Sequence, residues 1–139
     1  MLDIDNQTRI NIAEEMLKSI YSGLLIEESR EEKDVSLLLL DQGRIREYNK
    51  KYRGKDSETD VISFAADLAF LPTYGDIIID LSVAERQRGD RSLNYEVAVL
   101  FIHGLLHLLG YDHLSVKDKE IMKNKEKKYI NLFKKEILK

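Results

Sequence analysis

Apolar and polar positions alternate in two different ways along the first part of the chain. From Thr8 to Tyr21 the apolar residues recur three and four positions apart, which predicts an amphipathic helix capped by Asn6 or Thr8. Val35 to Leu40 is a short, nearly continuous apolar run bounded by polar residues, and it predicts a buried strand. The chain therefore opens with a helix that is followed by a strand.

The middle of the chain continues this alternation. A helix over Gln42 to Lys51 is expected after Asp41, which can cap it. Thr59 to Phe64 and Gly75 to Asp80 predict two more strands. The segment between them, Ala65 to Tyr74, is unusually apolar for a loop. It fits either a mobile lid or a hairpin connection tucked against the core.

The last third of the chain predicts helices only. Ser82 is expected to cap a short helix that ends at Gly89, and a longer helix begins at Ser92 or Asn94. Apolar residues cover most of the circumference of that longer helix, which indicates burial on most sides. Ser115 is the expected cap of a final amphipathic helix. Strands separated by helices, then helices alone, indicate an α+β or α/β domain, and we expect α+β with a small mixed β-sheet packed with helices.

Composition narrows the class of protein. The 139 residues, 43% hydrophobic and 34% charged, predict a single globular domain over residues 1–139. No apolar run approaches the roughly 18–20 residues that span a bilayer, and the acidic start lacks the pattern of a signal peptide. Without cysteine there is no disulfide framework. We expect a cytoplasmic protein that has no membrane partner.

Basic residues are clustered although the net charge is −3. The segment from Lys117 to Lys139 holds nine lysines against four acidic residues, and further clusters lie within 44–55 and 86–91. An acidic protein can still present one basic face to a polyanion. Such runs are more often solvated helix faces, so charge leaves both interpretations open.

All three histidines lie within one eleven-residue window. His103 and His107 are four positions apart, so on a helix they share one face. Gly110 can end that helix in the left-handed cap conformation and let the chain bring His113 back. Three neutral imidazoles with an open fourth position are what a catalytic zinc ion needs. The pattern therefore predicts a zincin-like metal helix.

Zinc is the first choice for this site, with one ion bound. Nickel, copper and iron also accept imidazole ligands. Zinc would lower the pKa of a bound water toward about 7. A structural zinc would be closed by a fourth protein ligand, and without cysteine only Asp112 or a distant carboxylate remains. Asp112 has two further roles open to it, as a hydrogen-bond partner that orients a histidine or as a cap of the turn after Gly110.

The spacing of the histidines also matches that of metzincin proteases, with one departure. Those proteases carry a glutamate general base directly after the first histidine, and this chain has Gly104. A peptidase would need another group to accept the water proton. Phosphodiester hydrolysis asks less of the protein, because a metal and a cation can neutralise the developing charge. The pattern therefore favours phosphodiester chemistry.

The segment His103 to His113 resembles the signature of the YbeY family, bacterial endoribonucleases of rRNA maturation. Three upstream blocks are similar to that family in the same order: Asn49–Asp56, Thr59–Phe64 and Gly75–Ile77. One departure is Ala65, where the family usually has proline, and it concerns the following loop rather than the histidines.

This resemblance implies a zinc-dependent, single-strand-specific endoribonuclease that acts on the 3′ end of small-subunit rRNA in ribosome biogenesis. It implies that His103, His107 and His113 are the metal ligands. Arg53 matches a family arginine held important for activity, and a guanidinium is a bidentate partner for the scissile phosphate. The expected partners are rRNA or ribosomal particles, with ribosomal proteins as further candidates and no DNA.

The residues alone leave two other functions open. One is a ribosome-assembly or RNA-binding factor whose zinc is structural; the chain has no aromatic-rich RNA platform, and its basic clusters separate this reading from a peptidase. The other is a metallopeptidase-like hydrolase, which Gly104 disfavours.

Overall fold

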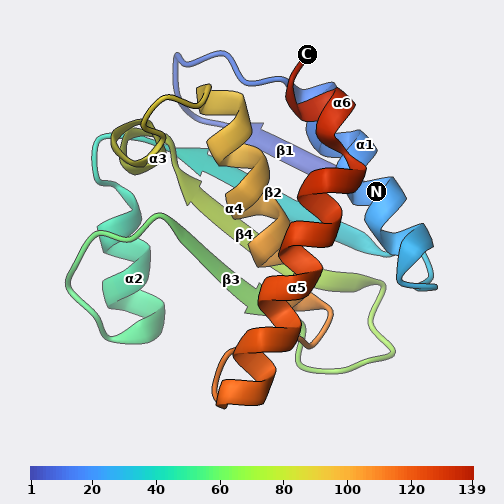
Figure 1. Ribbon diagram of the computed structural model, residues 1–139. Helices are drawn as coiled ribbons and strands as arrows, with labels where there is room; N and C mark the ends of the chain where they lie inside the picture. The colour runs from blue at the N-terminus through green and yellow to red at the C-terminus, as the bar shows by residue number, and fades with distance from the viewer.

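Four strands form one mixed sheet in the order β1-β2-β4-β3 (Figure 1). The computed structural model describes residues 1–139. β1 (Leu2–Asn6), β2 (Asp34–Leu40) and β4 (Thr73–Asp80) run parallel, and β3 (Val61–Ala65) pairs antiparallel with β4 at one edge. The mixed sheet with its helices confirms the predicted α+β class.

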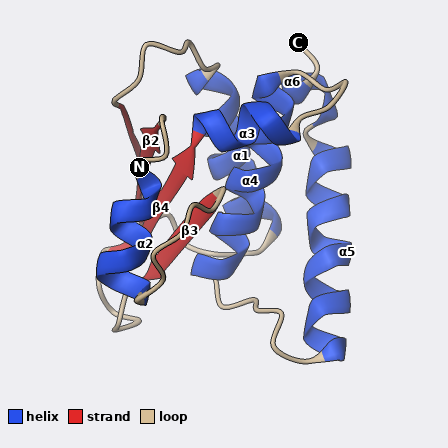
Figure 2. Ribbon diagram, turned by 90° about the vertical axis from the view of Figure 1, so that its left-hand side faces the viewer, coloured by secondary structure: helices blue, strands red, loops and turns tan.

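Helices cover the two faces of the sheet unequally. Figure 2 shows α2 (Ile45–Arg53) on one side of the sheet and the other helices on the opposite side. No helix is both long enough and apolar enough to cross a membrane. The six helices are α1 (Glu14–Glu27), α2 (Ile45–Arg53), α3 (Leu81–Gln87), α4 (Leu93–Leu108), α5 (Val116–Leu132) and α6 (Lys134–Ile137).

The alternation of side chains along the strands produces two cores. In β4, Ile77 and Ile79 belong to the large core, which includes α1 and α4, whereas Ile78 belongs to a small core. Ile45 of α2 and Ile62 of β3 complete that small core with Leu40. The crowded face of the sheet therefore carries α4, and the sparsely covered face carries α2.

Helix α4 lies in the middle of the large core. Val97, Phe101 and Leu105 are fully buried along it. A Cβ atom on Gly104 would lie 3.0 Å from Cγ2 of Ile77 in β4, so the glycine permits the close approach of helix and sheet. This packing places the histidine-bearing helix close against the sheet.

The structure corrects the predicted start of the chain. Leu2 to Asn6 is a strand that was not expected, and α1 begins at Glu14 rather than near Thr8. Asn6 Oδ1 accepts hydrogen bonds from the backbone N–H and the hydroxyl of Thr8, at 3.0 and 2.7 Å. The two residues that resembled helix caps therefore form a turn after β1, because Asn and Thr side chains stabilise both kinds of structure.

Some predicted helix ends are confirmed and others shift. Ser92 and Ser115 cap α4 and α5 by accepting backbone hydrogen bonds at 3.0 Å. At α3 the cap is Asp80 rather than Ser82, since its carboxylate accepts the backbone N–H groups of Ser82 and Val83. Helix α2 begins at Ile45, after a turn in which Gln42 has a φ of 57°.

The apolar segment after β3 is a hairpin connection between β3 and β4. Ala65 of β3 pairs with Gly75 of β4 at the end of the two strands that the connection joins. Gly75 has a φ of 131°, and a Cβ there would lie 2.0 Å from the carbonyl oxygen of Phe64, so only glycine fits. The connection is not tucked against the core as one alternative expected, because Leu68 is 50% and Phe70 80% exposed.

Candidate metal centre

The three histidines come together at the C-terminal end of α4. One ring nitrogen from each of His103, His107 and His113 lies within 4.8 Å of the others, and no carboxylate joins this group. Nε2 of His107 and Nδ1 of His113 are already 3.2 Å apart. Ligand nitrogens about 2.0–2.1 Å from one tetrahedral ion lie at about this separation. Small side-chain adjustments would therefore let this donor set hold a divalent cation.

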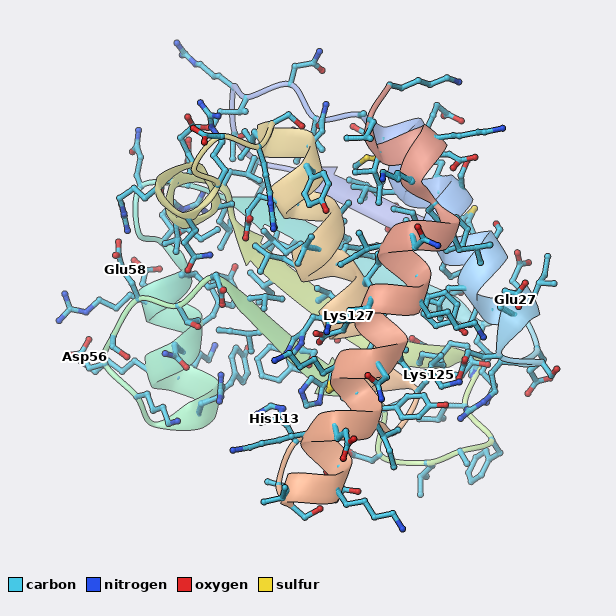
Figure 3. The ribbon with its side chains drawn as sticks, in the orientation of Figure 1. Glu27, Asp56, Glu58, His113, Lys125 and Lys127 are labelled. Atoms are coloured by element: carbon cyan, nitrogen blue, oxygen red, sulfur yellow. The ribbon has the colours of Figure 1, made fainter.

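The turn at Gly110 brings the third histidine back, as the sequence predicts. Gly110 has a φ of 105° and donates its N–H to the carbonyl of His107 at 3.0 Å. Tyr111 donates its N–H to the carbonyl of Leu106 at 3.1 Å. This pair of bonds is the Schellman motif, which ends a helix and reverses the chain. Figure 3 shows His113 below the end of α4, beside α5.

A carboxylate from α5 fixes the first histidine. Oε1 of Glu126 lies 2.5 Å from Nδ1 of His103, and both side chains are partly buried. A carboxylate can only accept here, so Nδ1 carries the proton and Nε2 keeps a lone pair for a metal. Sequence reasoning missed Glu126. It lies 23 positions from His103, and no local spacing connects the two residues.

The environment of His107 keeps its imidazole neutral. Burial lowers the pKa of His107, and the neighbouring His103 and His113 lower that pKa further. The carboxylates of Asp112 and Glu126 oppose this effect without outweighing it. A neutral imidazole is the form that binds a metal, so the site favours ligation over protonation.

A buried carboxylate at the end of α1 anchors the loop that carries His113. Glu28 accepts hydrogen bonds from the Tyr111 hydroxyl at 2.6 Å, from Lys125 Nζ at 2.9 Å and from the Tyr129 hydroxyl. Burial would raise the pKa of Glu28, but these three hydrogen bonds outweigh it and lower the pKa to about 2. Glu28 therefore joins α1, the histidine loop and α5 as a charged acceptor.

A cleft of about 500 Å³ opens beside His107. Its walls are the end of α4, the segment after α1 and the β3–β4 connection, with Arg30 and Lys33 among the lining residues. A groove of about 550 Å³ lies on the opposite face of the sheet, beside Tyr48 and Tyr52 of α2, and no histidine lines it. The cleft, and not the larger groove, therefore reaches the histidine cluster, through His107.

Neither of the two other candidate residues forms a hydrogen bond or ion pair with a histidine. Asp112 Oδ1 accepts the backbone N–H of Leu114 at 3.2 Å, which makes Asp112 a turn residue rather than a partner of a histidine. Arg53 is the exposed last residue of α2, and it does not line the cleft beside His107. No hydrogen bond or ion pair joins Arg53 to a histidine, so its catalytic role stays a prediction.

The position after the first histidine faces the sheet. Gly104 lies against Ile77 of β4, so a side chain at this position would begin in the core. The site therefore has neither the glutamate of a metzincin protease nor open space for one.

Comparisons with known proteins point to one family. The sequence model of the family described as endoribonuclease YbeY matches residues 3–134. A relative from Desulforamulus reducens, named endoribonuclease YbeY, is 39% identical over 134 residues, which cover 86% of this chain and 88% of the relative. A relative of the same name from Bacillus subtilis is 35% identical, with 96% and 95% of the two chains covered.

A solved structure agrees with these sequence matches. The solution structure of a protein from Thermotoga maritima superimposes with a TM-score of 0.67 at 26% identity, covering 99% of this chain and 89% of that one. The extent of the family match and the identity of the relatives confirm the resemblance seen in the histidine segment. The chain therefore belongs to the YbeY family of endoribonucleases, and it is a hydrolase that acts on RNA.

Proposed function

We propose that this protein is a zinc-dependent, single-strand-specific endoribonuclease that matures the 3′ end of small-subunit rRNA in the cytoplasm. The observation that carries the proposal is the convergence of three imidazole nitrogens within 4.8 Å, beside a cleft. Three histidines without a fourth protein ligand are typical of catalytic rather than structural zinc sites. Membership of the family supplies RNA as the substrate.

Each part of the centre has a distinct task in this proposal. His103, His107 and His113 hold the cation, and Glu126 keeps His103 in the tautomer that can bind it. When bound, zinc supplies Lewis-acid stabilisation of the phosphoryl group and lowers the pKa of water. Arg53 contacts the scissile phosphate and stabilises the negative charge that grows there. RNA must therefore reach α2 as well as the histidines.

Cleavage assays with matched variants test this function. Zinc-loaded protein should cut a single-stranded RNA and leave the same sequence intact in a duplex. His107→Ala should lose both zinc and cleavage, whereas Arg53→Ala should keep zinc and lose about 10²–10³-fold in kcat. Arg9→Ala, which removes another exposed arginine, serves as the control. Cleavage that persists in both site variants would overturn the assignment.

Removal of zinc separates catalysis from a structural role. A chelator should abolish cleavage while the circular dichroism spectrum stays that of a folded protein. Unfolding on zinc removal would instead support the RNA-binding assembly factor with a structural metal.

We further propose rRNA within ribosomal particles as the natural partner, with contacts to ribosomal proteins. Precursor particles should then be cut faster than the naked precursor RNA.

A further inference from the structure

A groove of about 300 Å³ lies between α4 and α5, outside the metal centre. Three cationic side chains line it: Arg91, Lys127 and Lys134. The remaining lining residues are polar or apolar, and no carboxylate is among them. We call this site the α4–α5 groove. Its charge is therefore purely positive in a protein whose net charge is −3.

The three cations of the α4–α5 groove have no acidic partner within ion-pair distance, and all three are exposed. Three basic residues within 44–55 and 86–91 do form ion pairs: Arg46 with Asp56, Arg86 with Glu58, and Arg88 with Glu85. The nearby Glu96 is buried and does not line the groove. The cations are thus free to bind an anion from solution.

The walls of the groove add features suited to a nucleic acid strand. The guanidinium of Arg91 lies 4.8 Å from the ring centre of Tyr95, so the two form a stacked cationic and aromatic surface. Asn131 supplies a hydrogen-bonding amide on the opposite wall. Single-stranded nucleic acids are bound by positive grooves with aromatic or guanidinium planes on which bases stack.

The groove extends toward the metal centre along α4 and α5, while Arg91 precedes α4 and Lys134 begins α6. Val99 of α4 lines the groove one turn before His103, and Lys127 of α5 directly follows Glu126, which contacts His103. The eight positions from Tyr95 to His103 correspond to about 12 Å along α4. In Figure 3, Lys127 lies along α5 above His113, whereas Lys125 lies on the other side of α5.

From this arrangement we propose that the α4–α5 groove binds backbone phosphates of the RNA strand, next to the site of cleavage. The inference rests on RNA being the substrate of the proposed function. The groove would hold the strand through charge and stacking, without reading its sequence, while the histidines act on a neighbouring nucleotide. Short RNAs that reach only the metal centre would gain no binding affinity from the α4–α5 groove.

Charge reversal with a matched control tests the groove. The test variant is Lys127→Glu with Lys134→Glu, and the control is Arg9→Glu with Lys18→Glu, which changes the net charge equally on exposed residues elsewhere. The zinc-loaded proteins are titrated by fluorescence anisotropy with a 2′-O-methyl RNA of about 16 nucleotides at several salt concentrations. Steady-state cleavage of a long RNA and of a very short RNA is measured in parallel.

We expect the groove variant to bind at least tenfold more weakly, and its salt dependence to weaken by about 1.4 in log–log slope, or about 0.7 for each lost phosphate contact. KM for the long RNA should rise while kcat and cleavage of the short RNA stay unchanged. The control should keep the wild-type slope. If charge reversal prevents folding, Lys127→Gln with Lys134→Gln should show the same change in slope.

Two results would overturn the proposal that the α4–α5 groove binds RNA. One is a wild-type slope in a folded groove variant, and the other is an equal loss in the control, which would reduce the effect to net charge. Either result leaves the proposed function standing if the wild-type protein cuts RNA. Failure of the wild-type protein to bind or cut any RNA would overturn both proposals.

Discussion

Glu126 of α5 lies 2.5 Å from Nδ1 of His103, so a helix remote in sequence sets the tautomer of the first histidine of the cluster. Glu126→Ala should lower the affinity for zinc about 10–100-fold, because an outer carboxylate orients the ring and raises its basicity. Competition with a chromogenic chelator measures this affinity. Glu120→Ala, an exposed glutamate on the same helix, should keep it. Wild-type affinity in Glu126→Ala would contradict the tautomer argument.

Glu28 should make the stability of the fold depend on pH. Its pKa is about 2 in the folded protein against an ordinary 4.5, so its contribution is complete above pH 4.5 and is lost as the pH falls toward 2. Glu28→Gln should lower the free energy of unfolding at pH 7 by about 1.5–3 kcal/mol.

Urea unfolding at several pH values measures this contribution. The difference between the wild type and Glu28→Gln should shrink as the pH falls from 4.5. Glu27→Gln, which changes the exposed neighbour labelled in Figure 3, should differ from the wild type by less than about 0.5 kcal/mol. A constant difference across this pH range would contradict the lowered pKa.

The two tyrosines that donate hydrogen bonds to Glu28 should have separable roles. Tyr111 and Tyr129 both donate hydroxyl hydrogen bonds to Glu28, but only Tyr111 lies on the loop that carries His113. Tyr111→Phe should therefore weaken zinc binding and stability together, whereas Tyr129→Phe should reduce stability alone. Zinc titration beside thermal unfolding makes the comparison. Equal zinc affinity in the two variants would show that the Tyr111 bond does not position His113.

Gly104 should tolerate a methyl group far better than a carboxylate. Gly104→Glu would begin its side chain against Ile77 in the core, and we expect a loss of more than about 3 kcal/mol or failure to fold. Gly104→Ala should change stability by about 1 kcal/mol at most, because helix propensity offsets the crowding. Denaturant unfolding measures both. A stable Gly104→Glu variant would show that the helix can move away from β4.

The sequence by itself determined the parts of this protein that depend on neighbours in the chain. The helix with His103 and His107 follows from spacing, and the return of His113 follows from Gly110, because helix geometry and the glycine cap are local. The cap at Ser115, and Ser92 as one of two candidate caps, were predictable for the same reason. The histidine segment and the three upstream blocks also resembled the YbeY family, and the comparisons confirm that family.

Only the tertiary structure decided the contacts between distant segments. Leu2 to Asn6 is a strand because β2 offers it a parallel edge, and a single polar–apolar alternation of five residues does not reveal that partner. The pairing of Glu126 with His103 and the binding of Glu28 to Tyr111 depend on how α5 and α1 pack around α4. Local sequence sets dihedral angles and caps, whereas packing sets which side chains meet. The convergence of the three histidines could therefore be predicted from the sequence, but the contact of His103 with Glu126 and that of Tyr111 with Glu28 could not.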